Sequence, residues 1–395
     1  MDSTNGSLLK NARFLRLWIG QSTSFLGDAI SMVALVVLVV QVTGSASAVG
    51  GALIARLLPT LASPLAGVLA DRLDRRLVLV ASDLARAGLV VGLVFATNLA
   101  TIYVLVFLMG IARTLFNPTV RAAFPSVVGG GDLTRANALI GGTFSISETA
   151  GPALGGLLVA TLGVDVAFVL DAATYLISAA MLSLIPLPRP EREEAGFGED
   201  LRSGFAYLAR SRVPLAIVLG AFLTVLTVDI TIPAEIFLAK GTFDAGDAGY
   251  GLLVGLYGGG MVLGSALMVA LGDRVRLLPL YFFGVFATAL ALLGTGLSPT
   301  FGLALGALVV AGVANGTENV ATETILQKRV PEAFLGRVFS VRFLGFSVGE
   351  ILAYGMGGAI VDASGVRFTY LLAGAATAAA GLIILIILVL VSDPQ

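Results

Sequence analysis

The chain of 395 residues contains no cysteine and no histidine, and charged residues make up only 12% of it. The lack of cysteine excludes disulfides and thiolate chemistry, and the lack of histidine excludes imidazole metal ligands and a histidine proton relay. The charged fraction is about half of that in an ordinary soluble protein. The formal net charge of −1 carries no information about nucleic-acid or acidic partners, and we expect no nucleic acid as a partner. We therefore expect neither a cofactor nor a metal ion.

Long apolar segments are abundant instead, and hydrophobic residues make up 57% of the chain. A helix of roughly 20 apolar residues can cross a bilayer. Twelve such segments follow one another at 14–42, 49–70, 77–97, 101–123, 136–162, 165–187, 213–239, 248–271, 279–297, 300–326, 338–361 and 366–391. The sequence therefore predicts an all-α membrane protein with twelve transmembrane helices.

These segments divide into a six-helix half over 1–187 and a second six-helix half over 213–395. The charged, proline-interrupted stretch 188–212 between them is a linker. Within it, Leu201, Phe205 and Leu208 have the spacing of a short helix on the membrane surface.

Basic residues indicate the orientation because they gather in alternate loops. Those loops hold Lys10, Arg13, Arg16, Arg72, Arg75, Arg76, Arg121, Arg135, Arg189, Arg192, Arg202, Arg210, Arg212, Arg274, Arg276, Lys328, Arg329 and Arg337. The other loops hold only Lys240 and Arg367. Cytoplasmic loops carry the excess of lysine and arginine. We therefore expect both termini and the linker in the cytoplasm, and the richness in arginine, alanine and glycine suggests a bacterial inner membrane.

The two halves repeat one another in sequence. Asp71 and Arg72 in LADRLDRR match Asp273 and Arg274 in LGDRVR, at an offset of 202 positions. The same offset pairs Glu148 with Glu350, Gly155 with Gly357 and Gly156 with Gly358. Two pseudo-symmetric copies of one unit are the plan of a transporter with its site between the halves.

Three motifs resemble a known family. The run Gly67–Arg76 (GVLADRLDRR) resembles the loop signature of the major facilitator superfamily, and Ser147–Gly156 (SETAGPALGG) resembles the fifth-helix signature of its antiporters. Phe25–Asp28 (FLGD), followed by Ala34 and Leu35, is similar to the first helix of its macrolide-efflux and siderophore-exporter branch. The resemblance implies the major facilitator fold and proton-coupled export by alternating access, with protons and a small molecule as partners.

The loop signature predicts a latch on the cytoplasmic side. A carboxylate at Asp71 can cap a nearby helix and pair with an arginine such as Arg121. The latch residues of both halves are Gly67, Asp71, Arg72, Arg75, Arg76, Arg121, Asp273 and Arg274. We expect this latch to hold the cytoplasmic side closed and to break when the halves rock.

The fifth-helix signature combines Gly151, Pro152, Gly155 and Gly156. Glycines let a neighbouring helix approach closely, and proline permits a bend. The second half has Tyr354 where Pro152 would fall. We therefore expect an asymmetric bend.

Ionisable residues within the apolar segments are the candidate coupling groups, because such groups are expensive in a bilayer. Asp28 lies on a polar stripe with Gln21, Ser24 and Ser31. The other candidates are Glu148, Glu350, Asp229, Glu318, Asp171, Arg113 and Arg56. These acids either take up protons or form ion pairs with Arg56, Arg113 or Arg342. Arg113 resembles the fourth-helix arginine of antiporters; the alternative is a permanent pair with an acid on the first or fifth helix. Asp83 and Arg86 are predicted to form a structural i,i+3 pair.

The absence of a glycine-rich loop followed by Lys-Ser or Lys-Thr leaves an ion gradient as the energy source. We thus expect a non-enzymatic, monomeric secondary transporter that exports amphipathic or hydrophobic small molecules. The alternatives are a lysophospholipid transporter and a non-transporting receptor or scaffold. Ferroportin-like metal export is disfavoured, since only hard oxygen ligands are present.

Overall fold

The computed structural model describes residues 8–63, 66, 69, 73–128, 132–187 and 197–391. These residues are almost entirely helical and contain no strand. The first six segments correspond to α1 (Ala12–Thr43), α2 (Ala46–Leu57) with the 3-10 turn η2 (Leu58–Ala62), α4 (Arg75–Val94), α5 (Leu99–Val128), α6 (Leu133–Leu162) and α7 (Val164–Ser183). A short 3-10 turn, η1 (Leu8–Lys10), precedes them.

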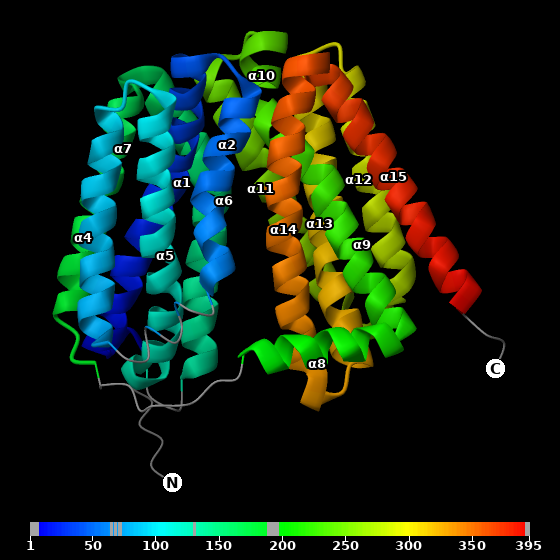
Figure 1. The fold of residues 1–395 in the computed structure, drawn as a ribbon, viewed down its shortest axis with the longest axis horizontal. Helices are drawn as coiled ribbons and strands as arrows, with labels where there is room; N and C mark the ends of the chain where they lie inside the picture. Colours follow the sequence, from blue (N-terminus) through cyan, green and yellow to red (C-terminus); the bar gives the residue numbers. More distant parts are fainter. Residues whose placement is uncertain are drawn as a thin grey trace. The chain divides into compact units, whose positions relative to one another are not determined.

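The second six segments begin with an interrupted helix. It comprises α9 (Arg212–Val228), η3 (Asp229–Ala234), α10 (Glu235–Phe237) and the π-helical turn η4 (Leu238–Thr242). The remaining helices are α11 (Gly246–Leu271), which is followed by η5 (Gly272–Arg274), α12 (Leu277–Leu297), α13 (Phe301–Arg329), α14 (Glu332–Ser364) and α15 (Val366–Val391). Figure 1 shows the long helices of each unit running side by side.

The predicted all-α membrane fold is confirmed. Within the described part of the chain, ten helices are long and apolar enough to cross a membrane. The other two predicted segments correspond to α2 and α6. Large apolar side chains also point outward, including Val269 at 81% exposure and Leu290 at 69%. Such surfaces are expensive in water and match the hydrocarbon core of a bilayer.

The linker helix is α8 (Phe197–Arg210), where the sequence predicts a short helix. One of its faces packs on α14. Leu208 is buried, and the Tyr207 ring stacks on Phe334 with centroids 4.8 Å apart. Phe205 on another face is exposed. Figure 1 shows α8 lying across the end of α14.

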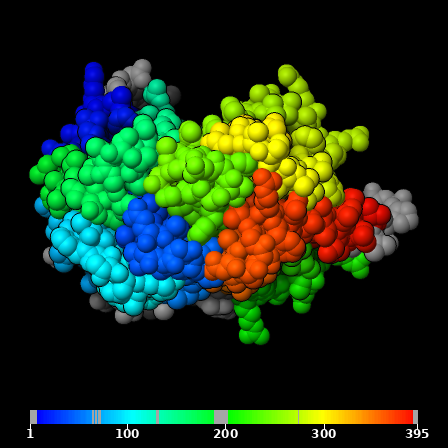
Figure 2. Space-filling model, turned by 90° about the horizontal axis from the view of Figure 1, so that it is seen from above, coloured from blue at the N-terminus to red at the C-terminus, as the bar shows by residue number. Residues whose placement is uncertain are grey.

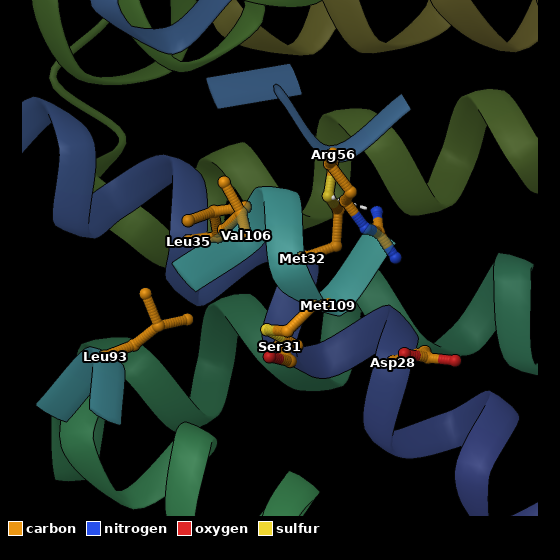
Figure 3. A pocket seen from close by; sticks show the side chains of 8 residues that line it. All are labelled: Asp28, Ser31, Met32, Leu35, Arg56, Leu93, Val106 and Met109. Atoms are coloured by element: carbon orange, nitrogen blue, oxygen red, sulfur yellow. Dashed lines mark hydrogen bonds between the residues drawn. The ribbon is translucent and has the colours of Figure 1, made fainter. Parts of the chain in front are cut away.

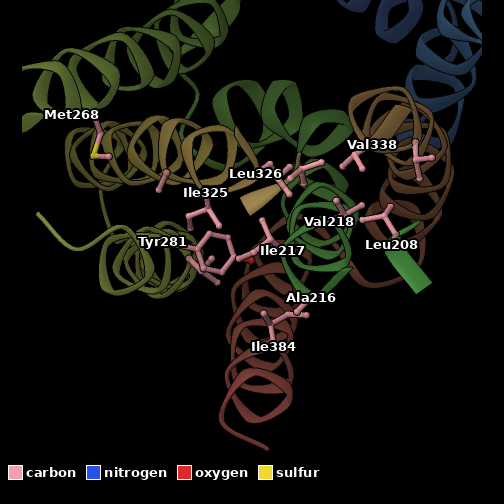
Figure 4. Packing of buried hydrophobic residues seen from close by; sticks show 14 residues of the cluster. Leu208, Ala216, Ile217, Val218, Met268, Tyr281, Ile325, Leu326, Val338 and Ile384 are labelled. Atoms are coloured by element: carbon pink, nitrogen blue, oxygen red, sulfur yellow. The ribbon is translucent and has the colours of Figure 1, made fainter. Parts of the chain in front are cut away.

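Contacts divide the chain into two compact units. One comprises Met1–Thr43 and Ala55–Ala195, and the other comprises Gly44–Ile54 and Gly196–Gln395. Most of α2, up to Ile54, therefore packs with the second unit. In that unit, the Tyr281 ring lies among Ile217, Ile325 and Ile384 (Figure 4), which joins four helices in one apolar core. In the space-filling view, α14 and α15 adjoin each other at the orange and red end of the colour scale (Figure 2).

The start of α2 is capped by a side chain from α14. Asp362 Oδ1 accepts a hydrogen bond from the Ala46 backbone N–H at 2.8 Å. Its Oδ2 accepts from the Ser47 N–H at 2.9 Å and from Ser45 Oγ at 2.7 Å. The first N–H groups of a helix have no partner within the helix, and a carboxylate there is also favoured by the helix dipole. Asp362 therefore fixes the first turn of α2 on α14.

Replacing Asp362 with alanine should lower the free energy of unfolding by about 1 kcal/mol, as removal of a helix cap does. The physical reason is that two backbone donors of α2 lose their acceptor. Detergent-induced unfolding of the purified protein would measure it. Ser364→Ala, on the exposed end of the same helix, is the matched control. Equal midpoints for the two variants would contradict the prediction.

Candidate functional site

A small pocket of about 20 Å³ lies in the first unit, within the polar stripe of α1 (Figure 3). It is lined by Asp28, Ser31, Met32, Leu35, Arg56, Leu93, Val106 and Met109. The Arg56 guanidinium donates from Nη1 to the Met32 sulfur at 2.8 Å. A cavity of this size has room for about one water molecule. Asp28 and Arg56 thus place opposite charges on one small pocket whose other walls are mainly apolar.

Asp28 is held by a tyrosine from another helix. Tyr175 on α7 is buried, and its hydroxyl donates to Asp28 Oδ1 at 2.5 Å. The close approach of α1 and α7 depends on Gly27, because a Cβ there would overlap Asp171 and Thr174. A larger residue at Gly27 would force the two helices apart.

Asp171 is a second buried acid beside α1. It is fully buried, and its Oδ2 has no hydrogen-bond partner among the described residues. The Thr174 hydroxyl donates to the Asp171 main-chain carbonyl at 2.8 Å and lies 3.3 Å from its Oδ1. Buried polar atoms are rarely left without a partner, so this one is unusual.

The Asp83–Arg86 pair on α4 lies next to Tyr175, the tyrosine that bonds Asp28. The predicted i,i+3 pair is confirmed as an ion pair whose members are 0% and 4% exposed. The Arg86 guanidinium also lies 4.3 Å from the ring centroid of Phe116 and 4.5 Å from that of Tyr175. This geometry joins α4, α5 and α7 through one cation.

Arg113 has no ion pair among the described residues. Arg56, Asp28 and Tyr175 lie within electrostatic reach of it. Glu148 on α6 is exposed, within reach of Arg56, Arg113 and Asp28. The alternative of a permanent pair between Arg113 and an acid on the first or fifth helix is therefore not found in this structure.

The second unit holds its acids in different surroundings. Glu318 on α13 is 3% exposed and shares a side-chain hydrogen bond with Thr224. Glu350 on α14 accepts from the Tyr354 hydroxyl at 3.3 Å. Arg342 pairs with the half-exposed Glu323 at 3.3 Å. It was a candidate partner for the buried acids, and its ion pair in this structure is with Glu323.

Asp229 lies where α9 ends. The following turn, η3, contains Pro233, which supplies no N–H for a helical hydrogen bond. Glu235 and Glu350 act electrostatically on Asp229. Lys240 lies in the π-helical turn and pairs with Asp247 at 2.6 Å. Among the described residues, no group of three or more acids is arranged to hold a metal ion.

Half of the predicted latch residues lie outside the described part of the chain. They are Gly67, Asp71, Arg72 and the side chain of Asp273. The described neighbours show how α4 begins: Asp74 caps it by accepting from the Leu77 N–H at 3.0 Å. The other described latch residues are Arg75 and Arg76 in the first turn of α4, Arg121 near the end of α5, and Arg274 in η5.

The glycines of α6 face α1. A Cβ on Gly151 would overlap Ala29, and one on Gly155 would lie 3.0 Å from the Ile30 Cα. Gly156 is also buried, and α6 continues through Pro152 to Leu162. The close approach expected from small residues is thus present between α6 and α1.

A family model described as transmembrane secretion effector matches residues 3–394. The chain belongs to this family of the major facilitator superfamily. It is therefore a multi-pass membrane transporter for small molecules.

Named relatives cover most of the chain. It is 30% identical over 332 residues to the enterobactin exporter EntS of Escherichia coli, which covers 80% of this chain and 77% of EntS. It is 24% identical over 381 residues to macrolide efflux protein A of Streptococcus pyogenes, covering 92% of each. An uncharacterized MFS-type transporter of Bacillus subtilis, YfiS, is 25% identical over 397 residues, with 96% and 94% covered.

Solved structures share the fold at low identity. The nucleoside transporter NupG matches with a TM-score of 0.78 at 13% identity, covering 95% of this chain and 99% of its own. A bacterial homologue of the iron transporter ferroportin matches with 0.76 at 16%, covering 96% and 99%. At such identities the likeness concerns the fold alone.

Tyr175 is not among the residues predicted from the sequence as partners of Asp28, and Arg86 is predicted only as half of a structural pair. A signal for the first was available. Asp171, Tyr175 and Ser178 recur at the spacing of one helix face, which marks a polar stripe on the segment 165–187. Its partner could not be found from the sequence because Asp28 is 147 positions away.

Proposed function

We propose that the protein is a proton-coupled exporter of amphipathic small molecules, working by alternating access as an antiporter. The observation that carries this proposal is Asp28: a carboxylate inside a membrane-spanning helix, at a small pocket that it shares with Arg56, with Tyr175 donating to it. Intramembrane carboxylates are expensive and commonly serve proton transfer. Protonation of Asp28 would compete with cargo, which couples the two fluxes.

The cargo class follows from the named relatives, an exporter of enterobactin and a macrolide efflux protein. Both names concern export of small molecules. The direct test is uptake of a radiolabelled macrolide and of enterobactin by everted vesicles with an imposed proton gradient. Gradient-dependent uptake of either compound, abolished by a protonophore, is the expected result. Uptake that depends on a sodium gradient and not on a proton gradient would contradict proton coupling. Uptake of a labelled lysophospholipid, but of neither other compound, would contradict the proposed cargo class.

We further propose a monomer in the bacterial inner membrane with both termini in the cytoplasm. The alternation of basic loops supports this orientation. The proposed working parts are the halves 1–187 and 213–395, tethered by 188–212.

We expect Asp71→Asn or Asp273→Asn to open the cytoplasmic side, because each removes a latch carboxylate. Since the chain has no cysteine, pairs of introduced cysteines can carry spin labels on the ends of α5 and α13. Distances between the labels should lengthen in either variant. A distance distribution like that of the unsubstituted protein would leave these aspartates as ordinary loop residues.

Glu148→Gln and Glu350→Gln should differ although the repeat makes the two positions equivalent. Glu148 lies near Arg56 and Arg113 and precedes Pro152, so we expect its substitution to change the pH profile of export. Glu350→Gln should mainly weaken the affinity for cationic cargo. Transport measured against pH and against macrolide concentration separates the two effects. If the two variants give indistinguishable profiles, the expected functional difference between Glu148 and Glu350 is contradicted.

A further inference from the structure

We propose that Arg86 is a positioning residue for the proton site at Asp28 and acts through Tyr175. The inference rests on the proposed function only in taking Asp28 as the group that exchanges a proton. Arg86 does not touch Asp28 by any hydrogen bond or ion pair in the described residues. The two groups are within electrostatic reach of each other, and the positioning effect that we propose is transmitted by the Tyr175 ring.

The Arg86 guanidinium is held on several sides. It forms an ion pair with Asp83 on its own helix and lies over the rings of Phe116 and Tyr175 at 4.3 and 4.5 Å. It is 4% exposed, so water does not screen these contacts. A guanidinium keeps its charge and stacks well on aromatic faces. Arg86 therefore fixes one face of the Tyr175 ring.

The opposite end of Tyr175 sets the state of Asp28. Its hydroxyl donates to Asp28 Oδ1 at 2.5 Å, and a hydrogen bond donated to a carboxylate favours the ionised form. The hydroxyl can keep this position only while the ring keeps its own. Displacing Arg86 should therefore weaken the bond and let Asp28 hold its proton to a higher pH.

Other charged groups also face this site, and their effects on Asp28 must be distinguished from that of Arg86. They are Asp171 on α7, Arg113 on α5, Glu148 on α6 and Arg56 on α2. Neither arginine among them lies over the Tyr175 ring as Arg86 does in the described residues, and Asp171 acts on Tyr175 electrostatically. The Asp83–Arg86 pair is neutral as a whole. Replacing both members by neutral amides thus changes the local net charge little and tests position rather than charge.

The experiment is an infrared pH titration of the full chain reconstituted in lipid. It follows the carboxylic acid band that Asp28→Asn removes, and so needs no cargo. The double variant Asp83→Asn/Arg86→Gln should raise the titration midpoint by about one pH unit, and Tyr175→Phe by a similar amount. The triple variant combines Asp83→Asn, Arg86→Gln and Tyr175→Phe. Its titration midpoint should equal that of Tyr175→Phe alone, because Arg86 acts through the tyrosine.

Arg86→Lys keeps the charge but loses the planar stack on the Tyr175 ring, so it should shift the titration midpoint of Asp28 in the same direction. It provides the test if the double variant does not fold. The control Glu323→Gln/Arg342→Gln removes an ion pair of the second unit and should leave the midpoint unchanged. An unshifted midpoint in both Arg86 variants, additive shifts in the triple variant, or no band lost in Asp28→Asn would overturn the proposal. If the titration midpoints shift as expected but the unsubstituted protein shows no gradient-driven transport, the proposed function alone is contradicted.

Discussion

Asp28→Asn should reduce gradient-driven export to the level of protein-free vesicles while the protein stays folded and inserted. The amide has nearly the shape of the protonated acid but cannot release a proton, so coupling is lost and cargo binding is retained. Tyr175 can still donate to the amide oxygen, since its hydroxyl points at Oδ1. Transport of a macrolide in everted vesicles, together with equilibrium binding to the purified protein, measures both effects.

The matched control is Asp165→Asn, the same substitution at an exposed position in the first turn of α7. It should transport normally. Normal pH-dependent export by Asp28→Asn would show that another carboxylate carries the proton, and Asp171, with its unpartnered oxygen, would be the next to test.

Arg86→Met should lower the free energy of unfolding by about 3–5 kcal/mol, because it leaves Asp83 charged and buried without its partner. Replacing both members of a buried pair leaves no uncompensated charge, and with hydrophobic residues of similar volume such a replacement is often neutral or stabilising. The double variant Asp83→Asn/Arg86→Gln should therefore be much more stable than Arg86→Met. Detergent-induced unfolding of the purified variants gives both values.

The pair Arg342–Glu323 provides the comparison. Its glutamate side chain is 53% exposed, so water solvates the charge that remains after Arg342→Met. The loss from the broken ion pair should then be below about 1 kcal/mol. Equal stability of Arg86→Met and Arg342→Met would contradict this prediction. It would mean that Asp83 does not remain as an uncompensated buried charge in Arg86→Met.

The fold followed from the sequence because apolar length is a local property. Each of the twelve segments can be recognised without knowing its neighbours, and the repeat at Asp71 and Asp273 orders them into halves. The Asp83–Arg86 pair was also predictable, since both residues lie on one helix face. Asp28 could be singled out as a charge inside an apolar segment.

The contacts that give Asp28 its surroundings were not predictable. Tyr175 reaches it from a helix 147 positions away, and Arg86 reaches Tyr175 from a third helix. Such contacts depend on how α1, α4 and α7 are rotated about their axes. That rotation is set by packing details such as the overlap that any side chain at Gly27 would cause. A single sequence does not contain that information in readable form.

The Asp362 cap has a consequence for biosynthesis. The carboxylate that completes the first turn of α2 lies 316 positions after the backbone N–H of Ala46 that it accepts from. During translation, α2 is made long before α14 leaves the ribosome, so the donors of its exposed first turn have only water as a partner until then. A nascent chain ending before Asp362 would carry an incomplete α2. The contact that fixes α2 on α14 therefore forms only late in synthesis, when residue 362 has been added.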